Sequence, residues 1–251
     1  MLQKEFKKQG DFLFRYRSYL PLIILVAGLA VFIQTKTSLS EAGVPFPGDI
    51  WLVVCLLVSL AGQIIRAVTV GYTPANTSGR NAAEQVADEI NTSGIYSSVR
   101  HPLYVGNFFM WLGLAMLTAN LWFIFSFVFL YWVYYERIMY AEEMFLVGKF
   151  GEAYENWAEK TPAFIPSFKN YRKPALSFSW KKVLKKEKNG ITGIFVIFFI
   201  FNLIAQWIDA GWGKFSLEKD FWFYAAIFFV VFYLIFKYLK RKTTVLDEPG
   251  R

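Results

Sequence analysis

The sequence is poor in the residues that build disulfide frameworks and metal sites. Its 251 residues include one cysteine, Cys55, and one histidine, His101. A single cysteine cannot form a disulfide within the chain, and one histidine with one distant cysteine is not a ligand set for a metal ion. Cys55 lies in an apolar segment, where thiolate chemistry is disfavoured, so we interpret it as a packing residue. We therefore expect neither a disulfide framework nor a metal site.

Charge is also scarce, and the segments without it are long and apolar. Charged residues make up 18% of the chain, against about a quarter in ordinary soluble domains, and apolar residues make up 55%. Several long segments have no charged residue at all, among them 103–135, 191–208 and 221–236. A helix needs about 20 apolar residues to cross a bilayer, and about 17 suffice for a short span. The sequence therefore indicates an integral membrane protein.

We predict an all-α fold, a polytopic membrane bundle of about six transmembrane helices. The expected spans are 18–34, 50–70, 103–118, 120–135, 191–208 and 221–237. As one helix, segment 103–135 would be about 50 Å long, which is too long for one crossing without a steep tilt. A break at Thr118-Ala119-Asn120 would make it a hairpin of two short helices. A single long tilted helix is the alternative.

Lysine and arginine gather on one side of this topology. Five lie in residues 1–17, eleven in 136–190 and five from Lys237 onwards, whereas the opposite loops contain only Lys36, Lys214 and Lys219. The positive-inside rule then places both termini and the segments 71–102 and 136–190 in the cytoplasm. The net charge of +8 follows from this topology. Since no nucleic-acid-binding motif accompanies the charge, we predict no nucleic-acid partner.

The chain divides into three regions by composition. These are two N-terminal transmembrane helices (1–72), a central region with the hairpin (73–168), and a basic segment with two C-terminal transmembrane helices (169–251). In the central region we expect an amphipathic helix near 82–90 and cytoplasmic helices over 136–151 and 152–160. The basic segment 169–188 has two interpretations, a solvated flank of the fifth span or an interfacial segment on anionic headgroups.

The one histidine lies in a dense motif where a polar loop meets the third span. The motif consists of Gly94, Tyr96, Arg100, His101, Pro102, Tyr104 and Gly106. A lone histidine is typically structural, but hydrogen-bond donors at the membrane–water boundary suit a cofactor with an anionic end and a sulfonium. Gly106 would let another backbone approach closely.

A second charged cluster follows the hairpin: Arg137, Glu142 and Glu143. Helical spacing places Glu142 on an apolar face that also includes Ile138, Met139, Phe145 and Leu146. Glu143 lies nearer the face of Glu136. An ionisable group on an apolar face near a membrane typically has a function. The alternative is a charged helix entrance with surface ion pairs, which contribute little.

Arg66 is the one charged residue within the second span. It either snorkels toward the cytoplasmic side or contacts an anionic headgroup of a substrate.

Taken together, these motifs resemble the isoprenylcysteine carboxyl methyltransferase family, within the wider group that includes phospholipid methyltransferases. The resemblance covers about 60–168 and rests on two motifs in the family's order, with the hairpin between them. The first is the Gly94 to Gly106 motif, and the second comprises Arg137-Ile138, Glu142-Glu143, Leu146, Phe150-Gly151, Tyr154 and Ile165-Pro166. The chain departs from eukaryotic prenylcysteine members at Asp88, where they have histidine, which affects the expected substrate more than the cofactor.

The resemblance implies a methyltransferase core with a cytoplasmic pocket for S-adenosylmethionine and a lipid or lipidated substrate that enters from the bilayer. By position, His101, Tyr104 and Glu142 would contact the cofactor, and the pocket would be shaped by Gly94, Tyr96, Pro102 and Gly106. Arg137 and Glu142 would lie at the reacting centre, where Arg137 would hold the anionic end of the acceptor. The membrane would be the inner (plasma) membrane in a bacterium or the endoplasmic reticulum in a eukaryote.

The acceptor is expected to be acidic, because a carboxylate or phosphate oxygen is already a nucleophile and needs no general base. A phospholipid amine is the alternative acceptor. Two other functions stay open: an NADPH-dependent sterol-type reductase, which shares the Arg-His motif, and a non-enzymatic transporter or scaffold. The sequence does not indicate an oligomeric state.

Overall fold

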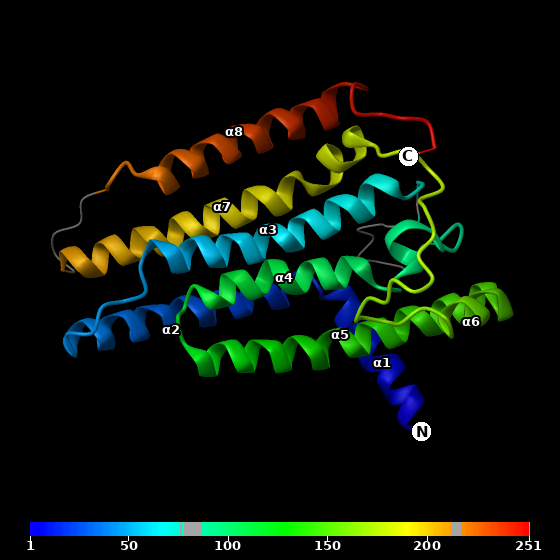
Figure 1. Cartoon of the computed structure of the whole chain (residues 1–251), viewed down its shortest axis with the longest axis horizontal. Helices are drawn as coiled ribbons and strands as arrows, with labels where there is room; N and C mark the ends of the chain where they lie inside the picture. Colours follow the sequence, from blue (N-terminus) through cyan, green and yellow to red (C-terminus); the bar gives the residue numbers. More distant parts are fainter. Residues whose placement is uncertain (76, 78–86, 212–216, 251) are drawn as a thin grey trace.

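The computed structural model describes residues 1–75, 77, 87–211 and 217–250, and these form a bundle of helices without a strand (Figure 1). The elements are α1 (Leu2–Arg15), α2 (Leu20–Glu41), α3 (Asp49–Tyr72), the 3₁₀ helix η1 (Gly94–Ser97), α4 (Pro102–Met116), α5 (Leu121–Phe150), α6 (Glu152–Ala158), α7 (Trp180–Ala210) and α8 (Phe221–Lys242). The predicted all-α fold is confirmed.

Five of these helices are long and apolar enough to cross a membrane: α2, α3, α5, α7 and α8. The sixth expected span is α4, a shorter apolar helix of 15 residues. The chain is therefore a multi-pass membrane protein. Both chain ends lie at one end of the bundle, together with α6 and the loop that follows it (Figure 1).

The hairpin break is where the sequence predicted it, so the alternative of one long tilted helix is wrong. The chain turns between Leu117 and Asn120, with Ala119 at a φ of 50°. The side chain of Asn120 accepts a hydrogen bond of 3.0 Å from the backbone N–H of Phe123 and thereby caps α5. As expected, α5 continues beyond the apolar stretch to Phe150, and α6 follows it.

The basic segment 169–188 is exposed in its first half and enters the bundle in its second half. Its second half is the beginning of α7, which starts at Trp180, well before the expected span. Lys182 and Lys188 are buried, and Nζ of Lys182 donates to the carbonyl oxygens of Thr73 and Pro74 at 2.5 and 2.9 Å. These side chains are therefore neither solvated nor laid on headgroups. Of the predicted helix over 82–90, residues 82–86 lie outside the described residues and 87–90 are not helical.

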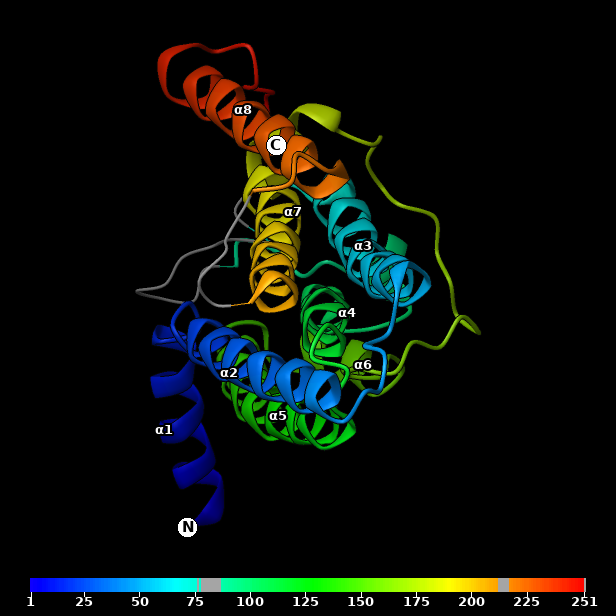
Figure 2. The same ribbon diagram turned by 90° about the vertical axis from the view of Figure 1, so that its left-hand side faces the viewer.

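Most helices pack in pairs, and α7 contacts four of the other helices. Extensive contacts join α3 to α4, α7 to α8, and α1 to α5, and α7 also contacts α2, α3 and α4. In the end view, α7 has α8 on one side and α2 and α4 on the other (Figure 2). Helices α3 and α4 approach each other closely, because a Cβ on Gly106 would lie 2.5 Å from Cγ of Arg66 and 2.9 Å from the carbonyl oxygen of Gly62. The close backbone approach expected at Gly106 is confirmed.

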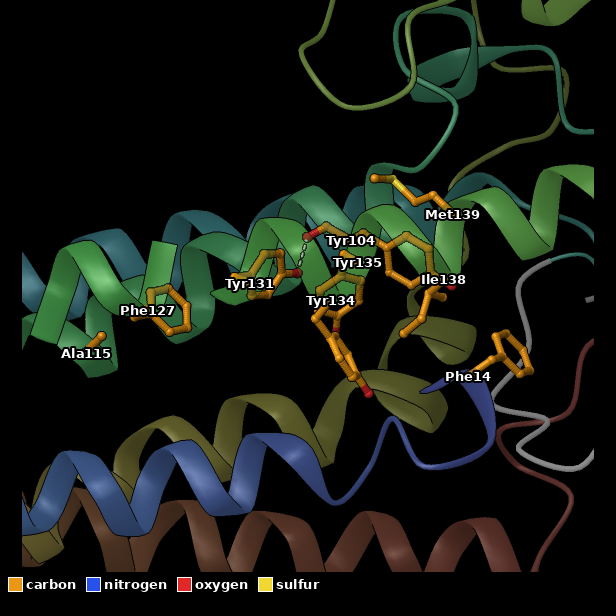
Figure 3. Packing of buried hydrophobic residues seen from close by; sticks show 9 residues of the cluster. All are labelled: Phe14, Tyr104, Ala115, Phe127, Tyr131, Tyr134, Tyr135, Ile138 and Met139. Atoms are coloured by element: carbon orange, nitrogen blue, oxygen red, sulfur yellow. Dashed lines mark hydrogen bonds between the residues drawn. The ribbon is translucent and has the colours of Figure 1, made fainter. Parts of the chain in front are cut away.

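An aromatic cluster fixes α5 against α4. Its buried members are Phe14, Tyr104, Ala115, Phe127, Tyr131, Tyr134, Tyr135, Ile138 and Met139 (Figure 3). The hydroxyl of Tyr131 donates to the backbone oxygen of Tyr104 at 2.7 Å, and Nδ2 of Asn107 donates to the hydroxyl of Tyr135 at 3.4 Å. Because the phenols are hydrogen-bonded, these rings pack inside the bundle without leaving a buried polar atom unpaired. The cluster sets the register of α5, and with it the place of Glu142.

Candidate functional site

A cavity of about 670 Å³ lies among α2, α3, α4, α5 and α7, and its lining changes from polar to apolar along two helices. On α4 the lining residues run from His101, Tyr104 and Asn107 to Met110, Trp111 and Leu114; on α7 they run from Lys186, Glu187 and Asn189 to Gly193, Ile194 and Ile197. Both helices begin at the end of the bundle where the termini lie (Figure 1). The cavity therefore has a polar end near the loops and an apolar end within the bundle, at a volume typical of small-molecule sites.

His101 lies between two carboxylates at the polar end. Its Nε2 is 2.9 Å from Oε1 of Glu143, and its Nδ1 is 3.5 Å from Oε2 of Glu142. Burial by itself lowers the pKa of His101, but the hydrogen bonds and the negative charges of the two glutamates outweigh it and raise the pKa above its ordinary value. An imidazole with a carboxylate at each nitrogen donates twice only when it is protonated. The site therefore favours the imidazolium form.

Glu142 also accepts a hydrogen bond of 2.9 Å from the hydroxyl of Tyr104. One of its carboxylate oxygens is thus shared by a phenol and the imidazole, and the side chain still lines the cavity. Tyr96 on η1 and Tyr154 on α6 line the same end. Burial raises the pKa of both phenols, so they stay protonated at neutral pH and remain hydrogen-bond donors.

Arg100 connects the histidine to the chain that follows α5. Its guanidinium donates to Glu143 at 2.8 Å and to the carbonyl oxygens of Ala158 and Thr161 at 2.6 and 2.8 Å. Its backbone N–H donates to the carbonyl of Pro162 at 2.9 Å. These bonds hold the end of α6 against the start of α4. Residues 100–101 and 158–162 therefore form one wall of the polar end.

Arg66 lies where the polar and apolar parts of the cavity meet, and it is ion-paired. Its Nε and Nη2 donate to the two carboxylate oxygens of Glu187 at 2.8 and 2.7 Å, and its Nη1 donates to Asn107 at 2.7 Å. Gln63 donates to the same carboxylate at 3.1 Å. The side chain is directed toward Glu187 on α7 and Asn107 on α4.

The structure brings together most of the residues that the sequence selected. The lining includes Arg66, Tyr96, His101, Pro102, Tyr104 and Glu142. Two glycines lie behind it: Gly94 has a φ of 60° and donates its N–H to the carbonyl of Arg172, and Gly106 packs on α3. Their part in the site is to fix the backbone.

Arg137 does not lie at the cavity, which corrects its expected place at a reacting centre. Its guanidinium lies 3.6 Å from the ring centre of Phe6 and donates to Gln9 at 3.3 Å and to Glu136 at 2.7 Å. These contacts direct it toward α1. In the sequence Arg137 and Glu142 look like one cluster, but on a helix five residues apart they face different neighbours.

Several residues of the site were not selected from the sequence. Glu143 was placed on another face of α5, Arg17 was one of many basic residues near the N-terminus, and Glu187 lay in the segment interpreted as a basic flank. Arg17 stacks on the ring of Phe14 at 3.9 Å, and both residues line the cavity. Only the regular spacing of Lys186, Asn189, Gly190 and Gly193 along one helical face could have indicated the wall formed by α7.

Glu142 and Glu143 contact opposite nitrogens of His101. The three side chains therefore do not converge on one point, as the ligands of a metal ion would. Within the described ranges, no three histidine, cysteine, aspartate or glutamate residues form a group that could hold a metal ion.

Comparisons with known proteins agree on the central part of the chain. The phospholipid methyltransferase family model matches residues 50–153. Protein-S-isoprenylcysteine O-methyltransferase of Schizosaccharomyces pombe is 36% identical over 107 residues, which cover 42% of this chain and 45% of the relative. The human protein of the same name is 29% identical over 125 residues, 49% of this chain and 44% of the relative.

A bacterial relative is similar over the same proportion. The cobalt-zinc-cadmium resistance protein CzcN of Cupriavidus metallidurans is 38% identical over 119 residues, which cover 47% of this chain and 52% of the relative. The chain thus matches about half the length of these curated relatives. No solved structure matches it significantly.

Proposed function

We propose that the protein is an integral membrane methyltransferase, because residues 50–153 match the phospholipid methyltransferase family model. It takes its methyl group from S-adenosylmethionine and transfers it to an acidic group, a carboxylate or phosphate, of a lipid or lipidated acceptor. The observation that carries the proposal is one continuous cavity with His101, Tyr104 and Glu142 at its polar end and an apolar opposite end. Such a cavity suits a polar cofactor that meets an amphipathic substrate.

The polar end fits the chemistry of this cofactor. Glu142 supplies a carboxylate for a cation or a hydroxyl pair, and the rings of Tyr104 and Tyr135 can face a positive sulfonium. Nε1 of Trp157 is a buried donor that makes no hydrogen bond to the described part of the chain, and Trp157 lines the cavity. A buried donor left unpaired is costly, so we assign it to a cofactor oxygen or nitrogen.

The chain contributes mainly alignment and a dry site. When bound, S-adenosylmethionine would supply an electrophilic methyl group for direct transfer to the acceptor oxygen, with a neutral thioether as the leaving group. His101 and Tyr104 hold the carboxylate of Glu142 in one orientation, and the aromatic cluster behind them excludes water. Alignment of two bound reactants can contribute about 7–11 kcal/mol to catalysis. No residue has to remove a proton from an ionised acceptor.

The anionic group of the acceptor would lie near Arg17, beside the ion pair of Arg66 with Glu187. Arg17 and Arg66 line the cavity, whereas Arg137 faces α1. An amine acceptor would have to lose a proton to the site, and Glu142 and Glu143 are already engaged with His101. This engagement favours an acidic acceptor over a phospholipid amine.

We propose the topology that the charges predict, with both termini in the cytoplasm and the polar end of the cavity on that side. The membrane would be the inner (plasma) membrane in a bacterium or the endoplasmic reticulum in a eukaryote. The division into regions 1–72, 73–168 and 169–251 also remains a proposal.

Calorimetric titration of the purified protein with S-adenosylmethionine tests the cofactor. We expect binding by the wild type, and a loss of about tenfold to a hundredfold in affinity for Glu142→Ala and His101→Ala, since hydrogen bonds to charged groups contribute roughly 1.5–3 kcal/mol. Glu136→Gln is the matched control, because Glu136 is an exposed carboxylate on the same helix and pairs with Arg137.

NADPH is titrated in parallel. Tight NADPH binding without a response to S-adenosylmethionine would replace the methyltransferase with a reductase. The acceptor is then sought by lipid mass spectrometry of cells with and without the gene, as a lipid that gains one methyl group only when the protein is present.

A further inference from the structure

Gly193 on α7 is a glycine that helix packing does not require. Glycine weakens the interior of a helix relative to alanine, so a glycine there usually has a structural reason. At Gly190, one turn earlier, the reason is visible: an added Cβ would lie 2.4 Å from Oε1 of Gln63 and 3.2 Å from Cε of Met110. At Gly193 an added Cβ would meet no described atom within 4 Å, and the residue has ordinary helical geometry.

The open space beside Gly193 belongs to the apolar end of the cavity. Gly193 lines the cavity together with Ile194 and Ile197 on α7 and with Met110 and Leu114 on α4. Along α7, no charged side chain lines the cavity after Lys186 and Glu187. A side chain at position 193 would therefore occupy volume in which only hydrocarbon is favourably held.

We propose that Gly193 determines which acceptors fit, because it leaves room for the hydrocarbon chain of the substrate. The inference rests on the proposed function and refines it: the acceptor has an acidic group near Arg17 and one long apolar chain that passes Gly193. Position 193 lies outside the matched residues 50–153. The choice of acceptor chain would thus be made by α7, a helix outside the part of the chain that defines the family.

Native mass spectrometry of the full-length protein in detergent tests this inference. The probe is an equimolar mixture of octyl, dodecyl and hexadecyl phosphate, which share an acidic group and differ in chain length. For the wild type we expect the hexadecyl complex to dominate. For Gly193→Leu we expect the ratio of hexadecyl to octyl complex to fall about tenfold, the change expected when a leucine displaces roughly two buried methylene groups.

Gly148→Leu is the matched control. Gly148 is also a helical glycine without an atom within 4 Å of an added Cβ, but it is exposed on α5 and outside the cavity lining. The ratio of hexadecyl to octyl complex should be the same for Gly148→Leu as for the wild type. Gly193→Ala should shift the ratio less than Gly193→Leu does, and should melt no lower than the wild type, since alanine is the better helix former.

The results that overturn the inference differ from those that overturn the proposed function. If the ratio of hexadecyl to octyl complex is unchanged in Gly193→Leu, or changes equally in Gly148→Leu, Gly193 does not determine which acceptors fit. A lower melting temperature of Gly193→Ala would show that helix packing requires the glycine, and this would also overturn the inference. Failure of the wild type to bind S-adenosylmethionine overturns the proposed methyltransferase instead.

Discussion

At the scale of single residues, the site depends on one imidazole between two consecutive glutamates. Glu142 and Glu143 project in different directions from α5, and both reach His101 because its ring lies between them. Helical spacing predicted the inward position of Glu142 but assigned Glu143 to another face. Two neighbours on a helix can contact one side chain only when that side chain enters between them, and a sequence does not show this.

The protonation of His101 makes stability depend on pH. The pKa of His101 is raised in the folded protein, so its imidazolium stabilises the fold fully below the unfolded pKa of about 6.5, and this contribution is lost as pH rises through the folded pKa. We expect the wild type to exceed His101→Asn in melting temperature by more at about pH 6 than at about pH 9. Thermal unfolding in detergent across this range checks it. A difference that stays constant would contradict the protonated state.

At the scale of elements, Gly151 separates two helices that would otherwise be continuous. Its φ of 54° and ψ of −136° fall in a backbone region that is essentially limited to glycine. The chain changes direction there, and α6 then places Tyr154 and Trp157 at the cavity. The sequence predicted one helix over 136–151 and another over 152–160, but not the direction of the second one.

Gly151→Ala should destabilise the protein by about 1–3 kcal/mol, because a Cβ strains this conformation. It should also weaken S-adenosylmethionine binding, since α6 would lose its position. Melting temperature and calorimetry measure the two effects. Gly148→Ala is the control: it lies on the same helix at a position that is not strained, and it should be neutral or slightly stabilising. Equal effects of both substitutions would show that backbone strain is not the cause.

Helix α7 shows where prediction from the sequence reached its limit. The apolar stretch 191–208 predicted a span, but the helix starts at Trp180, where Ser179 accepts a hydrogen bond from the N–H of Lys182. Composition placed the charged turns outside the bundle. In the structure Glu187 is bound by Arg66 and Gln63, and such a pairing between distant segments leaves no local pattern. The span was therefore predictable, and the wall of the cavity was not.

At the scale of the whole molecule, the ion pair between Arg66 and Glu187 joins the N-terminal and C-terminal halves. It links α3 to α7, and Asn107 on α4 accepts from the same guanidinium. Both charged side chains are largely withdrawn from solvent, with exposures of 12% and 3%. A buried pair of this kind orders the helices even where its net contribution to stability is small.

Substitution of Arg66 or Glu187 alone should destabilise the protein more than substitution of both. Arg66→Met or Glu187→Met alone should cost about 3–5 kcal/mol, because each removes one half of a buried ion pair. The double substitution should recover a large part of that loss. Unfolding in mixed micelles measures all three. If the two effects simply add, the side chains do not act as a pair.

The same contact has a consequence for how the protein is made. Glu187 is synthesised 121 residues after Arg66, so α3 enters the membrane long before its counter-charge exists. An arginine at the centre of a lone span raises the free energy of insertion by about 2.5–3.5 kcal/mol, and Arg66, which lies nearer the C-terminal end of α3, adds part of that cost. Until the ribosome has delivered α7, the nascent α3 therefore depends on its apolar residues and on neighbouring helices to stay inserted. A chain that ends before α7 has no Glu187 to pair with Arg66. We expect cellular quality control to recognise and degrade such a truncated membrane protein.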